Sequence, residues 1–389
     1  MTTLQPAPAA LPFQAADAVR RVERNSLRVQ QPQSSGDMVS LAMGEPGFDT
    51  PVQVREAAAR ALEEGYTHYS PLLGEAPLRE ELAGVIGGLR ATETLATDVL
   101  ITQGGTAGLS AAMLSIINPG DRVAIPDPTY SLYADLVSLA GGVTVPVPLG
   151  ADLHWDLERL AEALAGAKLF VFCNPSNPTG IVHTRAELEA LADMLSGTDT
   201  IVLSDEAYSA LVYTAEPFTS ALSVPGLEGR TVYCQTFSKT YAMTGWRVGY
   251  LWGPSDMIRA AARMHNTFNG SVNTAVQVAA LTALRTGAPD VARMHAAYAE
   301  RRDIMRAGLA AIPRLSVGNP EGAFYLFPRY AADISSADLV AHLRGFGVAV
   351  RPGSEFGRHG EGHLRLSYAA PASSIAAGVE RLAAGLRAL

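Results

Sequence analysis

Lysine is nearly absent from this chain of 389 residues. Lys168 and Lys239 are its only lysines, and the other basic residues are all arginines. A general bias towards arginine explains most of this imbalance. Arginine stays protonated in proteins, however, whereas a lysine amine can lose its proton and act as a nucleophile or a base. Each of the two lysines is therefore a candidate for chemistry that arginine cannot perform.

Cysteine is also scarce, and acidic residues outnumber the lysines and arginines. The two cysteines, Cys173 and Cys234, both lie in apolar runs, which argues against a disulfide framework or a cysteine-based zinc site, and we predict no metal. The formal net charge is −8, so the basic face expected of a nucleic-acid binder is missing. An acidic protein can carry a local basic pocket, so this net charge is compatible with an anionic substrate.

No apolar run reaches the roughly 18 residues that a membrane-spanning helix needs. Residues 1–11 are rich in alanine and proline and lack the basic stretch and apolar core of a secretion signal. Hydrophobic residues make up 48% of the chain, which is enough to form a large core. We therefore predict a folded cytoplasmic protein that contacts neither membrane nor nucleic acid.

Short apolar runs alternate with helical patterns through the first two thirds of the chain. Continuous apolar runs of this kind are typical of buried parallel strands, so we predict a mainly parallel, doubly wound α/β sheet of seven strands. The runs lie at residues 99–102, 123–126, 143–147, 169–173, 201–204, 232–236 and 248–252. The last hundred residues mix strands and helices, which indicates a smaller α+β domain. We assign residues 45–290 to the large domain, and residues 1–44 with 291–389 to the small one.

In a sheet of this kind, ligands bind beyond the carboxyl ends of the strands, so the residues that follow each strand are informative. Gly104, Gly105 and Thr106 open a helix after the first strand, where free N–H groups favour an anion. A routine tight turn is the alternative. The run 174–180, Asn-Pro-Ser-Asn-Pro-Thr-Gly, forms a stiff loop that can hold an asparagine amide in one direction.

Charged residues follow two further strands. Asp205, in Asp-Glu-Ala-Tyr, comes directly after a buried strand, where a carboxylate is costly without a cation such as a protonated heterocyclic nitrogen. Capping of a following helix is the alternative reading of this aspartate. Lys239 follows another strand and has hydroxyl neighbours, and Arg247 lies eight residues further on. A desolvated lysine near other cations has a lowered pKa and can form an imine with a carbonyl group.

These parts together describe one ligand. An aldehyde for the lysine, a pyridinium nitrogen for the aspartate, a ring hydroxyl and a phosphate are the features of pyridoxal 5′-phosphate (PLP). Lys168 opens a strand at the opposite end of the sheet, so we interpret it as structural.

From about residue 39 to its end, the chain resembles the class I/II aminotransferases, the fold-type I PLP enzymes typified by aspartate aminotransferase. Three motifs carry the resemblance in this order: Asn-Pro-x-Asn-Pro-Thr-Gly, Asp-Glu-x-Tyr and Ser-Lys-Thr-(x)4-Gly-Trp-Arg-x-Gly. The resemblance implies transfer of an amino group between an L-amino acid and a 2-oxo acid, in ping-pong fashion, through a Schiff base on Lys239. It also implies a homodimer with active sites at the subunit interface.

The resemblance assigns a role to each matching residue. It implies that Lys239, Asp205 and Tyr208 are catalytic, and that Asp205 partners the pyridine nitrogen. The groups that hold the rest of the cofactor would be Asn177 and Tyr208 at the ring oxygen, Tyr130 stacked on the ring, Tyr69 from the neighbouring subunit, and a phosphate cup of Gly105, Thr106, Thr236, Ser238 and Arg247. Arg365 would bind the substrate α-carboxylate, with Gly44 and Asn177 beside it.

Other functions on the same scaffold remain open at this point. A PLP-dependent C–S β-lyase would use the same lysine and aspartate. A PLP-containing transcription regulator would need an N-terminal DNA-binding domain of about 60 or more residues, whereas only about 40 precede the first strand. Some family members carry lysine just after the Gly-Gly pair as a second cation for a dicarboxylate, but here Thr106 stands there. An arginine or histidine elsewhere would have to supply it, and aromatic, branched and sulfur substrates stay open.

Overall fold

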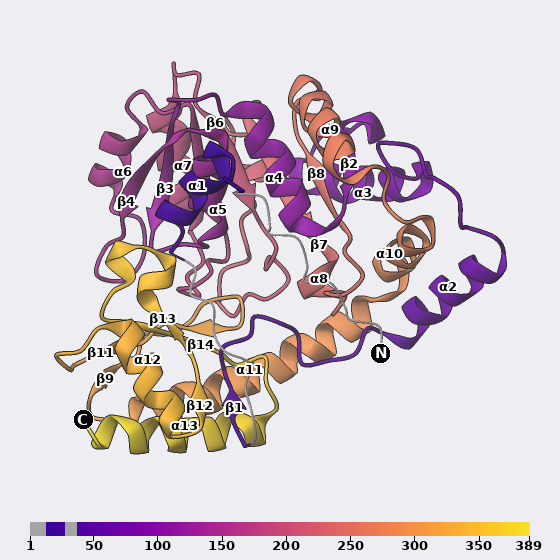
Figure 1. Ribbon diagram of the computed structural model, residues 1–389. Helices are drawn as coiled ribbons and strands as arrows, with labels where there is room; N and C mark the ends of the chain where they lie inside the picture. The colour runs from indigo at the N-terminus through magenta and orange to yellow at the C-terminus, as the bar shows by residue number, and fades with distance from the viewer. Residues whose placement is uncertain (1–12, 28–36) are drawn as a thin grey trace, which may run out of the picture.

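The computed structural model describes residues 13–27 and 37–389. Its centre is a seven-stranded sheet with the order β2-β8-β7-β6-β5-β3-β4 (Figure 1). The strands are β2 (Val99–Thr102), β3 (Arg122–Asp127), β4 (Val143–Pro148), β5 (Leu169–Cys173), β6 (Ile201–Asp205), β7 (Thr231–Thr236) and β8 (Gly249–Trp252). Only β8 runs against its neighbours, and all the other pairs in this sheet are parallel. The predicted fold class is thus confirmed.

Helices cover both faces of this sheet. Successive residues of β5 belong to different core clusters: Leu169, Val171 and Cys173 contribute to one, and Phe170 and Phe172 to the other. Since side chains alternate across a strand, both faces of β5 are buried, which explains its continuous apolar run. The helices of this part are α2 (Val52–Glu63), α3 (Ala76–Arg90), α4 (Gly104–Ile116), α5 (Leu132–Ala140), α6 (Leu157–Leu164), α7 (Arg185–Leu195), α8 (Phe237–Thr240), α9 (Ser255–Asn269) and α10 (Thr274–Thr286).

The long helix α11 (Ala288–Ala310) leads from the large sheet into the C-terminal part of the chain. In Figure 1, this C-terminal part lies below the large sheet. This part contains the three-stranded sheet β10-β14-β13, and β1 pairs with β12. The elements are β1 (Val39–Ser40), β9 (Leu315–Ser316), β10 (Tyr325–Leu326), β11 (Arg329–Tyr330), α12 (Ser336–Gly345), β12 (Val348–Ala349), β13 (Arg351–Pro352), β14 (Leu364–Ser367) and α13 (Ala372–Arg387). A segment from before the large sheet and one from after it thus share a ladder.

The N-terminal helix α1 (Asp17–Asn25) lies against the large part of the molecule. Arg21 donates hydrogen bonds to the carbonyl oxygens of Ser138 and Leu139 at the end of α5. Of the segment 1–44 that we assigned to the small domain, β1 therefore lies with the C-terminal elements, whereas α1 lies on α5. The division at residues 44/45 and 290/291 stays a prediction.

One helix of the large part has a clear start signal that the pattern of apolar runs does not reveal. In α7, Thr184 accepts a hydrogen bond from the Glu187 amide, and the Glu187 carboxylate accepts one from the Thr184 amide. This reciprocal arrangement is a capping box, readable as Thr-x-x-Glu. Among the described residues, no helix combines the length and the apolar composition needed to cross a bilayer.

Candidate active site

A cavity of about 510 Å³ opens at the carboxyl ends of β5, β6 and β7, where ligands bind in sheets of this type. Residues of the C-terminal part, from β10, β13 and β14, complete its wall. Of the residues singled out in the sequence, Gly44, Gly105, Thr106, Tyr130, Asn177, Asp205, Tyr208, Thr236, Ser238, Lys239, Arg247 and Arg365 all line it. Loops and strands that are far apart in sequence therefore converge on one site.

Tyr69 is the predicted site residue that does not reach this cavity. Its side chain is 98% exposed. The resemblance assigns this tyrosine to the cofactor of a neighbouring subunit, so a position away from the cavity of its own chain is what that role requires.

Lys239 lies on α8, in the turn that follows β7. Its Nζ donates a hydrogen bond to the carbonyl oxygen of Gly44, at 2.7 Å. Burial lowers the pKa of Lys239 to about 8; Glu45 opposes the shift, and the positive charges of Arg247 and Arg365 add to it. A lysine with this pKa is partly neutral near physiological pH, so its amine can act as a nucleophile.

Asp205 ends β6 and is buried. Its carboxylate accepts hydrogen bonds from the Tyr133 hydroxyl at 2.7 Å and from the Ala207 amide at 3.2 Å. Burial raises the pKa of Asp205, although both hydrogen bonds act in the opposite direction. The contact with Ala207 stays within the turn after β6, so Asp205 does not cap a regular helix. Its carboxylate instead faces a cavity that can hold a cationic ligand.

An anion site lies where α4 begins. Gly104 has a positive φ of 77°, and a Cβ at that position would meet Nη2 of Arg247 at 2.5 Å. Gly249 is equally constrained, because its Cβ would meet the Gly105 amide nitrogen at 2.9 Å. The Arg247 guanidinium therefore sits against the N-terminus of a 13-residue helix, beside the paired hydroxyls of Thr236 and Ser238. Helix dipole, guanidinium and hydroxyls together suit a phosphate group.

Arg365 lies on β14 and is 7% exposed. Its guanidinium donates to Oδ1 of Asn177 at 3.0 Å and to the carbonyl oxygen of Ala42 at 2.8 Å. The aromatic rings of Tyr325 and Phe356 lie 4.5 and 4.7 Å from it. Within the described part of the chain, Arg365 forms no ion pair and its Nε has no hydrogen-bond partner. A buried cation held only by neutral groups is arranged to receive an anionic ligand.

Asn177 and Tyr208 lie beside this arginine. Because the Asn177 oxygen accepts from Arg365, its amide nitrogen is the part left to donate to a ligand. The Tyr208 hydroxyl pairs with that of Tyr325 at 2.9 Å. Gly44 faces the same tyrosine, since a Cβ there would meet the Tyr325 oxygen at 2.1 Å. Glycine is therefore required at position 44 for the loop to approach the cavity.

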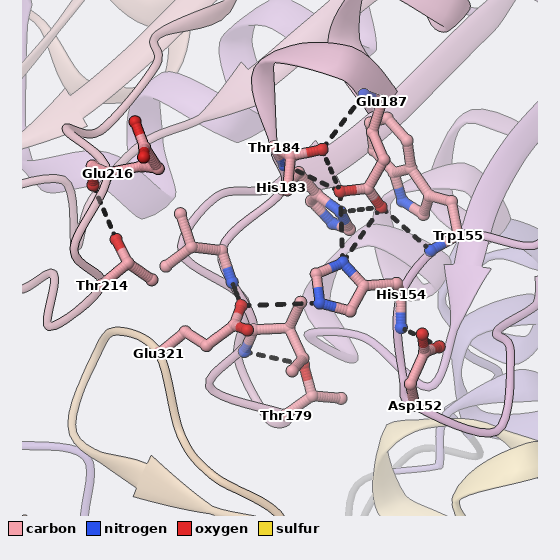
Figure 2. Close-up of polar contacts among 12 residues, drawn as sticks. Asp152, His154, Trp155, Thr179, His183, Thr184, Glu187, Thr214, Glu216 and Glu321 are labelled. Atoms are coloured by element: carbon pink, nitrogen blue, oxygen red, sulfur yellow. Dashed lines mark hydrogen bonds and ion pairs between the residues drawn. The ribbon is translucent and has the colours of Figure 1, made fainter.

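The His154 cluster comprises His154, His183, Glu187 and Glu321 (Figure 2). It contacts the loop 174–182, which carries Asn177. The His183 amide donates to Oδ1 of Asn174 at 2.9 Å, and the Val182 amide donates to Glu321 at 2.9 Å. His154 bridges the two carboxylates, with Nδ1 3.1 Å from Glu187 and Nε2 3.5 Å from Glu321. The cluster thus connects α7 and the segment before β10 to the loop.

Protonation in the His154 cluster follows from these contacts. Hydrogen bonds to Glu187 and then Glu321 raise the pKa of His154 to about 10. Burial pushes the pKa of Glu187 upwards, but hydrogen bonds from His154 and His183 outweigh it and leave this pKa below its usual range. Both Glu187 oxygens also accept from backbone amides, those of Trp155 and Thr184. The charges of the cluster are therefore compensated by its own members and by neighbouring backbone amides.

Sequence reasoning missed four residues of the cavity wall: Glu45, Tyr325, Arg351 and Glu355. It also missed Tyr133, whose hydroxyl donates to Asp205. Tyr133 is in edge-to-face contact with Tyr130, at 5.6 Å between ring centroids. It lies only three residues after Tyr130, which was predicted to stack on the cofactor, so the sequence offered a signal for Tyr133. Tyr325, Arg351 and Glu355 lie in the C-terminal part, where short strands carry little periodicity.

Comparisons with known proteins agree with this geometry. The family model for aminotransferase class I and II matches residues 36–382. An aspartate aminotransferase of Pyrococcus horikoshii is 34% identical over 94% of this chain and 96% of its own length. An aspartate/prephenate aminotransferase of Cereibacter sphaeroides is 36% identical over 86% of this chain and 87% of its own.

Solved structures give the same result. Aspartate aminotransferase of Thermus thermophilus with maleate matches with a TM-score of 0.85 and 33% identity, covering 96% of this chain and 97% of that one. An aromatic aminotransferase of Pyrococcus horikoshii matches with a TM-score of 0.89 and 33% identity, covering 95% and 99%. These names favour amino-group transfer over C–S cleavage. The chain therefore belongs to the class I and II aminotransferases, PLP-dependent enzymes that move an amino group between an amino acid and a 2-oxo acid.

Proposed function

We propose that this aminotransferase holds PLP on Lys239 and processes an L-amino acid and a 2-oxo acid in turn in the cavity between β5–β7 and β14. The residues present fit the cofactor. Gly104 and Gly249 leave no room for a Cβ, which keeps the start of α4 open to a phosphate. Asp205 is a buried carboxylate suited to a protonated ring nitrogen, and Lys239 is the cavity's lysine.

When bound, PLP supplies an aldehyde for amines and a pyridinium ring that accepts the electrons released as the substrate Cα–H bond breaks. The chain's own residues then have separable tasks. Lys239 takes a proton from the substrate Cα and returns it, which its lowered pKa allows. Asp205, with its hydrogen bond from Tyr133, stabilises positive charge at the base of the cavity. Tyr208 and the amide nitrogen of Asn177 donate to the ring oxygen.

Substrate orientation falls to the rim formed by β14. Arg365 presents the forked donors that suit a carboxylate, and its contacts with Asn177 and Ala42 fix the plane of the fork. Gly44 lets the neighbouring backbone approach the same carboxylate. A substrate anchored there has its Cα directed towards the part of the cavity that Lys239 lines.

The observation that carries this proposal is that a partly buried lysine with a lowered pKa and a buried arginine without an ion pair among the described residues line the same cavity. The test is a half-reaction screen, in which purified holoenzyme is mixed with single amino acids and loss of the cofactor's absorbance band is followed. Borohydride reduction before the screen should attach the cofactor covalently to Lys239. Labelling of Lys168 instead, or no spectral change with any amino acid, would refute the proposal.

We further propose a homodimer in which Tyr69 reaches the cofactor phosphate of the partner. Its 98% exposure supports this role, and Leu72, three residues further along the chain, is 59% exposed as well. Complementation is a sharp test: mixing the inactive variants Lys239→Ala and Tyr69→Ala creates hybrids with one intact site only if Tyr69 acts across the interface. Recovery of activity on mixing is expected, and its absence would contradict the exchange of Tyr69.

We also propose that the enzyme works in the cytoplasm and that residues 45–290 form one domain against 1–44 with 291–389. The thiols of Cys173 and Cys234 are both buried and free, which suits a reducing compartment. The pairing of β1 with β12 supports the assignment of residue 39 onwards to the small domain.

A further inference from the structure

Two neighbouring strands provide separate contacts for the proposed cofactor. β6 ends at Asp205, which would face the ring nitrogen, and Tyr208 lies in the turn that follows. β7 ends at Thr236, a member of the predicted phosphate cup, and Lys239 lies on α8 directly after it. The two strands run parallel, and their last register pair is Asp205 with Cys234. The spacing of the two chain segments beyond this pair therefore sets the spacing of the two sides of the site.

The side chain of Gln235 links the two segments just beyond that pair. Its Nε2 donates to the carbonyl oxygen of Glu206 at 2.8 Å and to Oγ of Ser209 at 2.9 Å, both in the turn after β6. Its Oε1 accepts from the Thr236 amide at 2.8 Å. One end of the side-chain amide thus binds a carbonyl oxygen and the other an N–H group, which fixes the orientation of the amide. The amide bridges β7 and the turn after β6.

The turn that Gln235 contacts is also held by its own hydrogen bonds. The Ser209 amide donates to the Glu206 carbonyl oxygen at 3.0 Å, which closes the turn. The Glu206 carboxylate is fully buried, and it accepts from the Ser220 hydroxyl at 3.0 Å and from the Ala221 amide at 2.9 Å. The turn is therefore well ordered, and the Gln235 amide adds the contact that holds it against the end of β7.

Gln235 does not belong to the wall of the active-site cavity. It is 8% exposed and borders a second cavity, of about 270 Å³, whereas Thr236 borders both cavities. An effect of Gln235 on a bound cofactor must therefore pass through Thr236 and through the turn after β6.

We propose that Gln235 is a positioning residue that sets the distance between two anchors of the cofactor, Asp205 for the ring nitrogen and Thr236 for the phosphate. This inference rests on the proposed function, because that function places the cofactor on these two residues. Two anchors bind one stiff ligand strongly only when their spacing matches it. Loss of the Gln235 amide should therefore weaken binding of the whole cofactor more than binding of either of its parts.

The test measures binding to the apoenzyme of Gln235→Met, which nearly keeps the size of the side chain and removes its amide. The ligands are pyridoxamine 5′-phosphate, pyridoxamine and inorganic phosphate, each titrated by calorimetry. The dissociation constant of pyridoxamine 5′-phosphate should rise about 10-fold or more, whereas the constants of the two parts should stay within about 2-fold of the wild type.

The matched control is Thr200→Val, at the opposite end of β6. It removes a buried hydrogen bond, from the Thr200 hydroxyl to the carbonyl oxygen of Ala167 at 2.8 Å, and should leave all three constants unchanged. A second variant serves if Gln235→Met does not fold. Ser209→Ala removes one acceptor of the Gln235 amide and should weaken pyridoxamine 5′-phosphate selectively, by about 3- to 5-fold.

The pattern across the three ligands decides the proposal. If phosphate or pyridoxamine alone loses as much affinity as pyridoxamine 5′-phosphate, Gln235 supports a single anchor and the proposal is overturned. Unchanged constants for all three ligands in a folded Gln235→Met would overturn it as well. A wild-type apoenzyme that does not bind pyridoxamine 5′-phosphate would instead refute the proposed function itself.

Discussion

The active-site cavity and the His154 cluster both bury charged side chains, but they partner those charges differently. In the His154 cluster, each carboxylate meets an imidazole and backbone amides, so opposite charges compensate one another. In the cavity, Lys239, Asp205 and Arg365 form hydrogen bonds with neutral groups of the described residues: carbonyls, amides and a hydroxyl. Buried charge without a countercharge is costly, so its presence indicates that a ligand supplies one.

This contrast predicts that substitutions in the cavity reduce activity at little cost in stability, and that substitutions in the cluster do the reverse. The largest effect is expected for Lys239→Ala. It should lower turnover about 10⁴-fold or more, because both the covalent attachment of the cofactor and the proton transfer are lost. The measurement is steady-state turnover together with the absorbance of the bound cofactor.

Lys168→Ala is the matched control, since it removes the other lysine of the chain, at the opposite end of the sheet. Its turnover should stay within about 2-fold of the wild type. Normal turnover in Lys239→Ala would contradict the assignment of the site.

Arg365→Met should lower the efficiency with amino acids about 10²- to 10³-fold, because the buried guanidinium that receives the α-carboxylate is lost. The melting temperature of the apoenzyme should not fall, since a buried cation without an ion pair is replaced by an apolar side chain of similar length. Kinetics with amino acids test the expected loss of efficiency, and thermal unfolding of the same preparation tests the expected melting temperature. A marked loss of stability with retained efficiency would remove the distinction between the two regions.

Glu187→Gln should reverse this pattern. It breaks the pairs with His154 and His183 and should lower the free energy of unfolding by about 3 kcal/mol. The chemical step should change little, because the cluster touches the loop that carries Asn177 and not the reacting groups. Denaturant unfolding and kcat test the two expectations, and a loss of kcat larger than about 10-fold would make Glu187 a positioning residue.

The smallest effect concerns pH. The pKa of His154 is raised from its ordinary value near 6.5 to about 10, so the protonated form is favoured by folding. Its contribution to stability is fully present below about pH 6.5 and is lost as pH rises through about 10. The stability difference between wild type and His154→Gln should therefore shrink between these limits. A difference independent of pH would show that His154 acts through packing alone.

How far the sequence led depended on the kind of signal. The bounds of β2 and β5 agree with the predicted ranges, because continuous apolar runs mark strands buried on both sides. The sequence also predicts a helix over residues 15–31 and a strand over 39–43. The helix ends at Asn25, and the part of that prediction from residue 28 onwards lies outside the described residues. The strand is only Val39–Ser40, since its pairing with β12 extends no further.

The same division applies to the site. Asp205, at the end of β6, and Lys239, in the turn after β7, were found because the carboxyl end of a strand has a known place in this type of fold. Tyr133 and Arg351 were missed for a physical reason. Tyr133 contacts Asp205 across 72 positions of sequence, and Arg351 faces the cavity because of its register with Arg365. No local pattern reports either relation.

The sequence by itself determined the fold class, the cofactor chemistry and the candidate residues at the strand ends, because apolar periodicity and short motifs are local properties of the chain. Only the tertiary structure decided which charges are compensated and which are not. It paired His154 with two carboxylates, left Arg365 without one, and placed Arg351 beside it. Compensation of charge depends on distances between segments remote in sequence, and those distances exist only once the chain has folded.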